Sequence, residues 1–241
     1  RKETIMNRES SLYTIIYASV MVIIVAVGLA FTHQALSEKQ IANENIDKMQ
    51  QILRSLRIDA SAKDAEAKYA ELIKNAYLIK ADGSIVDGSE GTQPTNDAFA
   101  TDISKSGADA LPVFVAEVDG QKLYVIPMTG KGLWGGIWGY MSFAENGSTI
   151  YGADFGHDSE TPGLGAEIVY PSFRNQFIDK ELLKNGEFKS IAVVKHGQSA
   201  SDRDYVDGIS GGTITSKGVN DMLLESVGKY KSFLLHLNAE Q

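Results

Sequence analysis

The amino-acid sequence predicts one N-terminal transmembrane helix followed by a single α+β domain with an antiparallel sheet. Three observations predict this fold: a long apolar run near the N-terminus, strand patterns joined by tight-turn residues in the middle, and helical patterns on either side of those strands. The 241 residues are enough for one sizeable domain besides an anchor. We expect an N-terminal tip and transmembrane helix at residues 1–34, a helical stalk at 35–75 and the domain at 76–241.

The apolar run covers residues 12–31, and no charged residue occurs between Ser10 and Ser37. A helix of 20 residues spans about 30 Å, which is the thickness of a bilayer's hydrocarbon core. The alternative is a cleaved signal peptide, which has a shorter apolar region followed by a small-x-small cleavage site. Here Phe-Thr-His-Gln follows at 31–34, so the pattern favours an uncleaved anchor.

Charges on either side of the run indicate its orientation. Arg1, Lys2 and Arg8 precede it, whereas only Lys39 and Lys48 lie close behind it. Because cytoplasmic flanks carry the excess of basic residues, we expect a cytoplasmic N-terminus and a domain outside the cytoplasm.

Composition excludes several function classes. The formal net charge is −8, and no basic stripe is present to neutralise phosphates, so a nucleic-acid partner is not expected. The chain has no cysteine, which excludes disulfides, thiolate metal sites, iron–sulfur ligation and a cysteine nucleophile. We expect no metal site.

Periodicity and turn residues place the elements of the domain. Asp82-Gly83 and Asp119-Gly120 are pairs typical of tight hairpins. Residues 87–110 are rich in small polar residues and predict a surface loop or short helix. We expect helices at 35–57, 61–75, 172–177 and 215–237, and strands at 77–80, 84–86, 113–118, 122–128, 140–143, 149–153 and 189–195.

A glycine-rich stretch at residues 130–139 alternates glycine with large apolar side chains. Glycine permits close backbone approach, and Trp134 and Trp138 could form the walls of a site for a planar ligand. Packing of both tryptophans in the core is an equal alternative.

Residues 207–219 contain the strongest chemical signal. Ser210, Gly211, Gly212 and Thr213 run directly into a helical pattern, and a glycine pair before a helix N-terminus favours a phosphate. A hydroxyl of Ser210, Thr213 or Thr215 could donate to that phosphate or become a covalent attachment point. The alternative is an ordinary capped helix start. The spacing of a Walker loop is not met.

Residues 207–213, DGISGGT, resemble the flavinylation motif D-x-x-[S/T]-G-A-[S/T], in which a dedicated flavin transferase esterifies the last hydroxyl to the phosphate of FMN. The surrounding pattern is similar to the C-subunit family of the Na⁺-translocating NADH:quinone reductase, a bacterial inner-membrane respiratory complex. The segments that carry the resemblance are SLYTIIYASVMVI at 11–23, GKGLWG at 130–135, ETPGLGAEI at 160–168 and VDGISGGTITSKGV at 206–219.

Two positions depart from the family pattern. The motif usually has alanine where this chain has Gly212, and glycine is small enough to fit the transferase. The family often has histidine two residues before the glutamate of ETPG, whereas His157 lies three residues before Glu160. No role is therefore assigned to His157, which we expect to be a loop histidine.

The resemblance implies a role for each residue of these segments, and none is catalytic. It implies FMN on Thr213, with Asp207 recognised by the transferase. It places Ser210, Gly211 and Gly212 around the phosphate, Ile214 and Thr215 near the ribityl chain or ring, Glu160, Thr161, Gly163 and Leu164 in a facing loop, and Leu133 and Trp134 over the ring.

The resemblance also implies an activity and a place in the cell. Electrons from NADH would reach this FMN and pass to another flavin subunit and then to ubiquinone, which supports sodium export by the whole complex. The implied partners are the other subunits and the flavin transferase, and the domain would face the periplasm. The chain itself has no G-x-G-x-x-G after a strand for NADH, and its span has no ionisable residue except His33 at its edge.

Three other functions fit parts of the pattern. The equivalent flavoprotein subunit of an Rnf-type electron transport complex shares the flavinylation motif. A membrane-tethered binding or sensor domain without flavin would need residues 210–213 to be a simple helix cap. A serine hydrolase using Ser210 lacks support because no G-x-S-x-G elbow is present.

Overall fold

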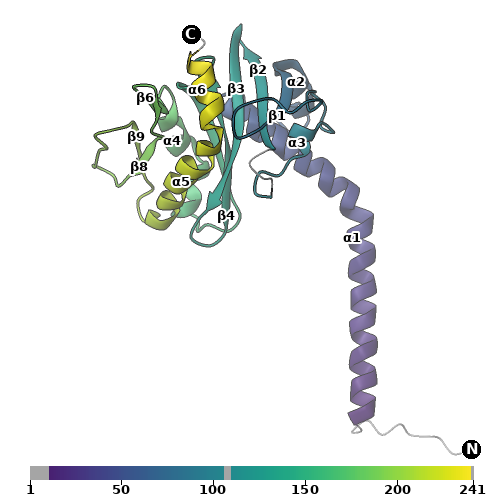
Figure 1. Cartoon of the computed structure of the whole chain (residues 1–241). Helices are drawn as coiled ribbons and strands as arrows, with labels where there is room; N and C mark the ends of the chain where they lie inside the picture. The colour runs from purple at the N-terminus through teal and green to yellow at the C-terminus, as the bar shows by residue number, and fades with distance from the viewer. Residues whose placement is uncertain (1–10, 106–109, 240–241) are drawn as a thin grey trace, which may run out of the picture. The chain divides into compact units, whose positions relative to one another are not determined.

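The computed structural model describes residues 11–105 and 110–239. Contacts group the chain into two units, Arg1–Asn45 and Ile46–Gln241. Helix α1 (Ser11–Ser55), purple in Figure 1, is within the described residues the one helix long and apolar enough to cross a membrane. It joins the apolar run at 12–31 and the helix expected at 35–57 into one helix. Arg1, Lys2 and Arg8, which carried the prediction of orientation, lie outside the described residues.

The second unit contains a five-stranded antiparallel sheet in the order β1-β2-β3-β4-β5. Sequential strands pair because tight turns join them, and the clearest turn has Asp119 and Gly120 with φ of +51° and +76°, as a two-residue hairpin requires. The α+β fold with an antiparallel sheet is therefore confirmed. The strands are β1 (Ile73–Ile79), β2 (Leu111–Val118), β3 (Gln121–Lys131), β4 (Gly136–Ala144) and β5 (Ile150–His157).

The hairpin expected at Asp82-Gly83 is only partly formed. The Lys80 amide donates to the Ser84 carbonyl and the Val86 amide donates to the Leu78 carbonyl, both at 2.9 Å, but these bonds form an isolated bridge between Ile79 and Ile85 rather than a strand. A short helix, α3 (Asp97–Ala100), then follows in the region expected to be a loop or short helix. Asn96 begins it by accepting the Ala98 amide at 2.8 Å.

One face of the sheet is covered by the end of α1 together with α2 (Ala65–Leu72) and α3. Met49, Ile52, Leu53 and Leu56 recur at helical spacing and are buried, so this part of α1 belongs to the core. The compact unit accordingly begins at Ile46, whereas the sequence predicted a stalk through residue 75. The helix expected at 61–75 is shorter because β1 takes over at Ile73.

The opposite face is covered by α5 (Thr213–Glu225), the 3₁₀ turn η3 (Val227–Tyr230) and α6 (Lys231–Ala239), drawn yellow in Figure 1. Helix α5 packs mainly on β3, and its buried Val219, Met222 and Leu223 join that core. The expected helix at 215–237 is thus two helices with a 3₁₀ turn between them. Shorter elements precede α5: η1 (Gly165–Val169), α4 (Pro171–Arg174), η2 (Asn175–Phe177), β6 (Leu183–Lys184), β7 (Glu187–Phe188), β8 (Ala192–Val194) and β9 (Tyr205–Asp207).

Candidate functional site

The loop between β9 and α5 is tied to the first turn of the helix. Gly211 has φ of +75°, a conformation that glycine adopts without strain. The Ile209 amide donates to the Ser216 hydroxyl at 2.8 Å, and the Ser216 amide donates to the Gly212 carbonyl at 2.8 Å. The segment predicted to lead into a helix therefore does so, and α5 begins at Thr213.

The start of α5 leaves backbone donors free. In the part of the chain that the structure describes, the amides of Thr213, Ile214 and Thr215 have no acceptor. The residue before the helix, Gly212, has no side chain to cap them. A first turn with free amides and the positive end of a 13-residue helix favours an anion.

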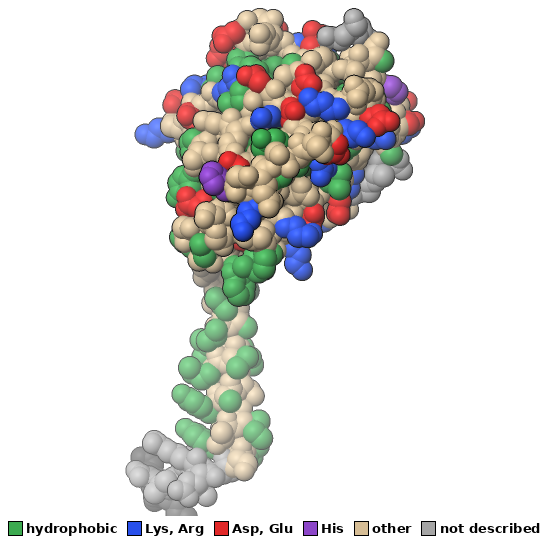
Figure 2. All heavy atoms as spheres, turned by 90° about the vertical axis from the view of Figure 1, so that its left-hand side faces the viewer, with side chains coloured by type: hydrophobic (Ala, Val, Ile, Leu, Met, Phe, Trp, Pro, Cys, Tyr) green, Lys and Arg blue, Asp and Glu red, His purple; other side chains and the backbone are tan. Residues whose placement is uncertain are grey.

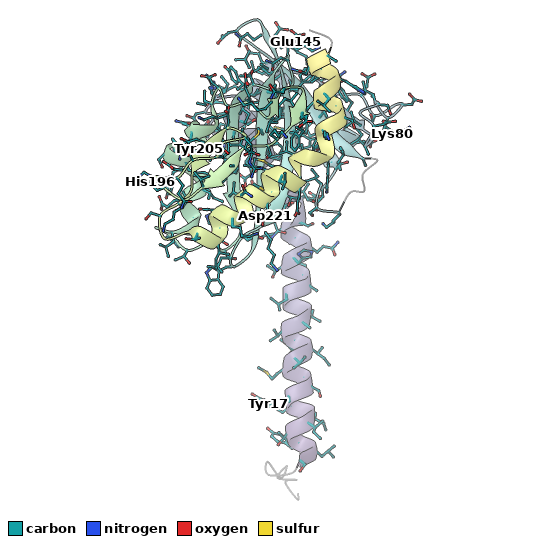
Figure 3. All side chains as sticks on the ribbon, turned by 60° about the vertical axis from the view of Figure 1, so that its left-hand side comes forward. Tyr17, Lys80, Glu145, His196, Tyr205 and Asp221 are labelled. Atoms are coloured by element: carbon teal, nitrogen blue, oxygen red, sulfur yellow. The ribbon has the colours of Figure 1, made fainter. Side chains whose placement is uncertain are left out.

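A pocket of about 330 Å³ lies between α5 and the β8–β9 strands. Thr213, whose side chain is exposed, lines it together with Ser210, Gly211, Lys195 and His196. Figure 3 labels His196 beside the two strands and Asp221 on α5. Figure 2 shows the face that carries β6, β8 and β9, where basic and acidic side chains are interspersed.

Glu160 connects its own loop to the segment that contains Trp134 and to the first turn of α5. Its side chain is buried, one carboxylate oxygen accepts the Trp134 amide at 2.9 Å, and the other accepts the hydroxyl of Thr215. Burial raises the pKa of Glu160, but hydrogen bonds from the Thr215 hydroxyl and from the amides of Trp134, Leu133 and Gly135 lower it further than burial raises it. The pKa therefore lies below its ordinary value, and the carboxylate stays ionised.

Glycines allow the 160–165 loop to pack on the start of α5. A Cβ added at Gly165 would overlap the Thr215 hydroxyl and the Glu160 carboxylate. A Cβ at Gly211 would lie 2.6 Å from the Leu164 side chain. The structure thus brings together the segments at 130–135, 160–168 and 207–215, which the sequence marked separately.

The expected site residues divide into an exposed and a buried group. Glu160 and Thr215 are buried and bond to each other, and Gly212 is buried as well. The side chains or backbone of the others are exposed, namely Ser210, Gly211, Thr213, Ile214, Thr161, Gly163, Leu164, Leu133 and Trp134.

Four of the exposed residues are large and apolar. Leu133 is 44% exposed, Trp134 67%, Leu164 41% and Ile214 55%. All four belong to segments that the structure brings to the start of α5, and exposed apolar side chains near one another are typical of a surface that a ligand or another protein covers. Trp138, in contrast, is half-buried, and its ring nitrogen donates to Gln51 at 2.9 Å.

Asp207, at the end of β9, is held by a residue that sequence reasoning missed. The Asp207 amide donates to the Gln176 side-chain oxygen at 2.9 Å, and the Asp207 carboxylate lies 3.1 Å from the His196 ring. No local pattern could reveal Gln176, because the two residues are 31 apart in the chain. His157, expected in a loop, is the last residue of β5 and accepts the Glu160 amide at 3.3 Å.

Comparisons with known proteins identify the family. Residues 132–227 match the family model described as FMN-binding domain. The C subunit of the Na⁺-translocating NADH-quinone reductase from Vibrio alginolyticus is 32% identical, with 83% of this chain and 81% of that protein covered. This chain belongs to the C-subunit family of Na⁺-translocating NADH-quinone reductases. The Pseudomonas aeruginosa protein of the same name is 28% identical over 96% of this chain and 97% of its own.

Solved structures from the same family support this assignment. The C subunit from Parabacteroides distasonis is 54% identical, with a TM-score of 0.77 and coverage of 83% of this chain and 96% of that one. NqrC of Shewanella oneidensis is 26% identical, with a TM-score of 0.64 and coverage of 82% and 99%. Members of the family belong to an oxidoreductase complex, and the apolar α1 is consistent with a single-pass bacterial membrane protein. The family indicated by the sequence motifs is therefore confirmed.

Proposed function

We propose that this chain is the electron-carrying flavoprotein subunit of a Na⁺-translocating NADH:ubiquinone oxidoreductase, with FMN joined by a phosphoester to Oγ1 of Thr213. The observation that supports it best is the exposed Thr213 side chain at the first position of α5, beside three free backbone amides. This junction lies inside the residues matched by the FMN-binding domain model.

The residues present fit the phosphate of FMN. The amides of Thr213, Ile214 and Thr215 supply donors, and the helix dipole favours the negative charge. Gly211 and Gly212 add no bulk beside the attachment point, and the exposed Ser210 hydroxyl lines the same pocket. A helix start with these features would hold a phosphate diester without a metal ion.

The residues present also fit the flavin ring. Leu133, Trp134, Leu164 and Ile214 are exposed and apolar, and they would supply the surface that covers the ring. Thr161 and Gly163 lie on the same loop as Leu164 and would approach the flavin from that side. Glu160 and Thr215 are buried and bonded to each other, so in this proposal they would also hold the loop against the start of the helix.

Attachment requires an activated flavin and an enzyme to transfer it. FMN itself carries no leaving group on its phosphate, so the donor would be a flavin dinucleotide. The Thr213 oxygen would form the new bond to phosphorus as the pyrophosphate bond breaks, the threonine proton would be lost, and AMP would leave. A flavin transferase would recognise Asp207 and the glycines that follow it, where residues 208–211 are exposed or half-buried.

Bound FMN supplies reversible electron transfer, while the protein supplies its position and tunes its potential. Covalent attachment allows the flavin to lie at an exposed site, where neighbouring carriers in the complex can reach it, without being lost. The chain would pass electrons between subunits toward ubiquinone and so support sodium export by the complex. Helix α1 would anchor it in the inner membrane with its N-terminus in the cytoplasm and its domain in the periplasm.

The experiment is coexpression of the full chain with its flavin transferase, followed by a denaturing gel viewed under ultraviolet light. We expect a fluorescent band in the parent that disappears in Thr213→Val. The matched control is Thr95→Val, which removes an exposed threonine hydroxyl outside the segments of the site and should keep the band. Circular dichroism melting of both variants establishes that they are folded.

Two results would contradict the proposal. One is a fluorescent Thr213→Val band, which would place the flavin on another residue. The other is a parent that stays dark although the transferase labels an established substrate in the same cells.

A further inference from the structure

A second pocket, of about 300 Å³, lies where the end of α1, strand β5 and helix α4 meet. It shares no lining residue with the pocket beside α5. Three arginines line it: Arg54 and Arg57 from the end of α1 and the residues after it, and Arg174 from α4. Nothing in the proposed function uses these side chains.

Two of the arginines are bonded to a buried carboxylate. Arg54 donates from Nε and Nη2 to the two oxygens of Asp154, at 3.0 and 2.9 Å. Arg174 donates from Nη1 to Asp154 at 2.9 Å. The Asp154 side chain is 2% exposed, so this pairing explains why two cations lie together at the edge of the core.

The third arginine has no such explanation. Arg57 donates from Nε to the Tyr151 carbonyl at 2.6 Å, and its guanidinium lies 4.1 Å from the centre of the Tyr151 ring. No carboxylate within the described residues pairs with it. Asp59 also lines the pocket, but its side chain is 88% exposed and lies 4.0 Å from Arg174, a separation at which water screens the attraction.

The pocket therefore keeps a positive charge and free donors in a chain whose net charge is −8. Three arginines against Asp154 and Asp59 leave one net positive charge. Among the described residues, Nη1 of Arg54, both Nη atoms of Arg57 and Nε of Arg174 have no hydrogen-bond acceptor.

We propose that this pocket binds an oxyanion of the phosphate class. Guanidinium groups recognise carboxylates and phosphates through paired donors. A planar carboxylate is already satisfied by two arginines, as Asp154 shows. Donors from a third arginine suit a tetrahedral anion, whose oxygens point in more than one plane. The anion is either free phosphate or the headgroup of an anionic phospholipid, and the proposal does not depend on flavin attachment.

The test uses the flavinylated full chain in detergent, titrated with inorganic phosphate at constant ionic strength and followed by calorimetry. We expect saturable binding by the parent and at least about tenfold weaker binding by Arg57→Gln, because charge-assisted hydrogen bonds are lost. Arg57 makes no bond to Asp154, so this variant keeps the buried pairing and should fold. Arg57→Lys keeps the positive charge but loses the paired donors of the guanidinium, so it should bind phosphate with intermediate affinity.

The control is Lys80→Gln, which removes a positive charge next to β1, at the opposite edge of the sheet from β5, and should bind phosphate like the parent. Figure 3 labels Lys80. A second titration uses dihexanoyl phosphatidylglycerol. If this lipid binds at least tenfold more tightly than phosphate, and depends on Arg57, the anion is a headgroup. If it binds no more tightly, the anion is free phosphate.

Three results would overturn the proposal. The first is the absence of saturable phosphate binding by the parent. The second is equal binding by the parent and Arg57→Gln. The third is Arg57-dependent binding of an aspartate-rich peptide by a protein that binds neither phosphate nor the lipid, which would make the pocket a protein-docking site.

Discussion

At the scale of single residues, Glu160 determines how the candidate site is held together. Its sequence context, ETPG, predicted a residue facing the cofactor, yet its side chain is buried and bonds to Trp134 and Thr215. The sequence could not reveal this pairing, because Thr215 lies 55 residues further along the chain. A glutamate on a loop is usually exposed, and here the side chain is buried between the start of α5 and the segment that contains Gly132 and Trp134.

The buried pairing makes a prediction for Glu160→Gln. The amide offers fewer acceptors to the three segments, so we expect a loss of about 2 kcal/mol in the free energy of unfolding near neutral pH. Because folding lowers the pKa of Glu160, its contribution is complete above the pKa of an unfolded glutamate and is lost as the pH falls below it. Urea unfolding of the parent and the variant from pH 7 to pH 3 measures this.

We therefore expect the free energies of unfolding of the parent and of Glu160→Gln to become equal as the pH falls. Glu225→Gln is the control, because Glu225 is exposed at the end of α5, and it should stay within about 0.5 kcal/mol of the parent. A difference between Glu160→Gln and the parent that keeps its size down to pH 3 would show that the charge of Glu160 is not what stabilises the fold.

At the scale of elements, the sequence predicted the turn pairs and the glycine-rich start of α5. It did not predict that the 160–165 loop packs on the start of α5. Asp119-Gly120 predicted the β2–β3 hairpin because a two-residue turn with positive φ needs such residues. The parallel pairing of β8 with β9 had no signal, since no tight turn joins parallel strands. That pairing brings Lys195 and His196 to the pocket beside Thr213.

Gly165 tests the contact between the 160–165 loop and α5. In Gly165→Ala the new methyl group would overlap Thr215 and Glu160, so we expect a loss of about 1–3 kcal/mol in stability. Flavin attachment should fall as well, because the loop would move away from the start of α5. Thermal melting and gel fluorescence measure the two effects.

Gly228→Ala is the matched control. A Cβ there would lie 3.6 Å from Phe188, an ordinary contact, and the variant should melt and label like the parent. If Gly165→Ala labels and melts normally, the loop can adjust, and the close approach of the loop to α5 is not required.

At the scale of the whole molecule, the sheet is covered on both faces, and the helices before it are part of its core. The sequence predicted a helical stalk at residues 35–75 from the helical patterns at 35–57 and 61–75. The structure instead buries Leu53, Leu56 and Tyr69 against the sheet. Each buried side chain of this size contributes roughly 1.5–3 kcal/mol, while a domain's net stability is about 5–15 kcal/mol.

Truncation distinguishes a domain that begins at residue 46 from one that begins at residue 76. A chain of residues 46–241 keeps every buried residue of the compact unit and should unfold cooperatively within a few degrees of the parent. A chain of residues 76–241 loses part of strand β1 together with the end of α1 and helix α2, which cover one face of the sheet, and should show no cooperative transition. Circular dichroism melting of both fragments measures this. A cooperative transition of the shorter fragment near that of the longer one would restore the boundary at residue 75.

By itself, the sequence determined the long apolar N-terminal helix, the antiparallel α+β domain and the family. These depend on local patterns: an uninterrupted apolar run, turn pairs between alternating strands, and short motifs whose residues are neighbours in the chain. Only the tertiary structure decided that Glu160 and Thr215 are buried against each other, that the end of α1 is core, and that three arginines share a pocket. Those features depend on side chains that are distant in the chain and meet only when the sheet has packed between its two layers of helices.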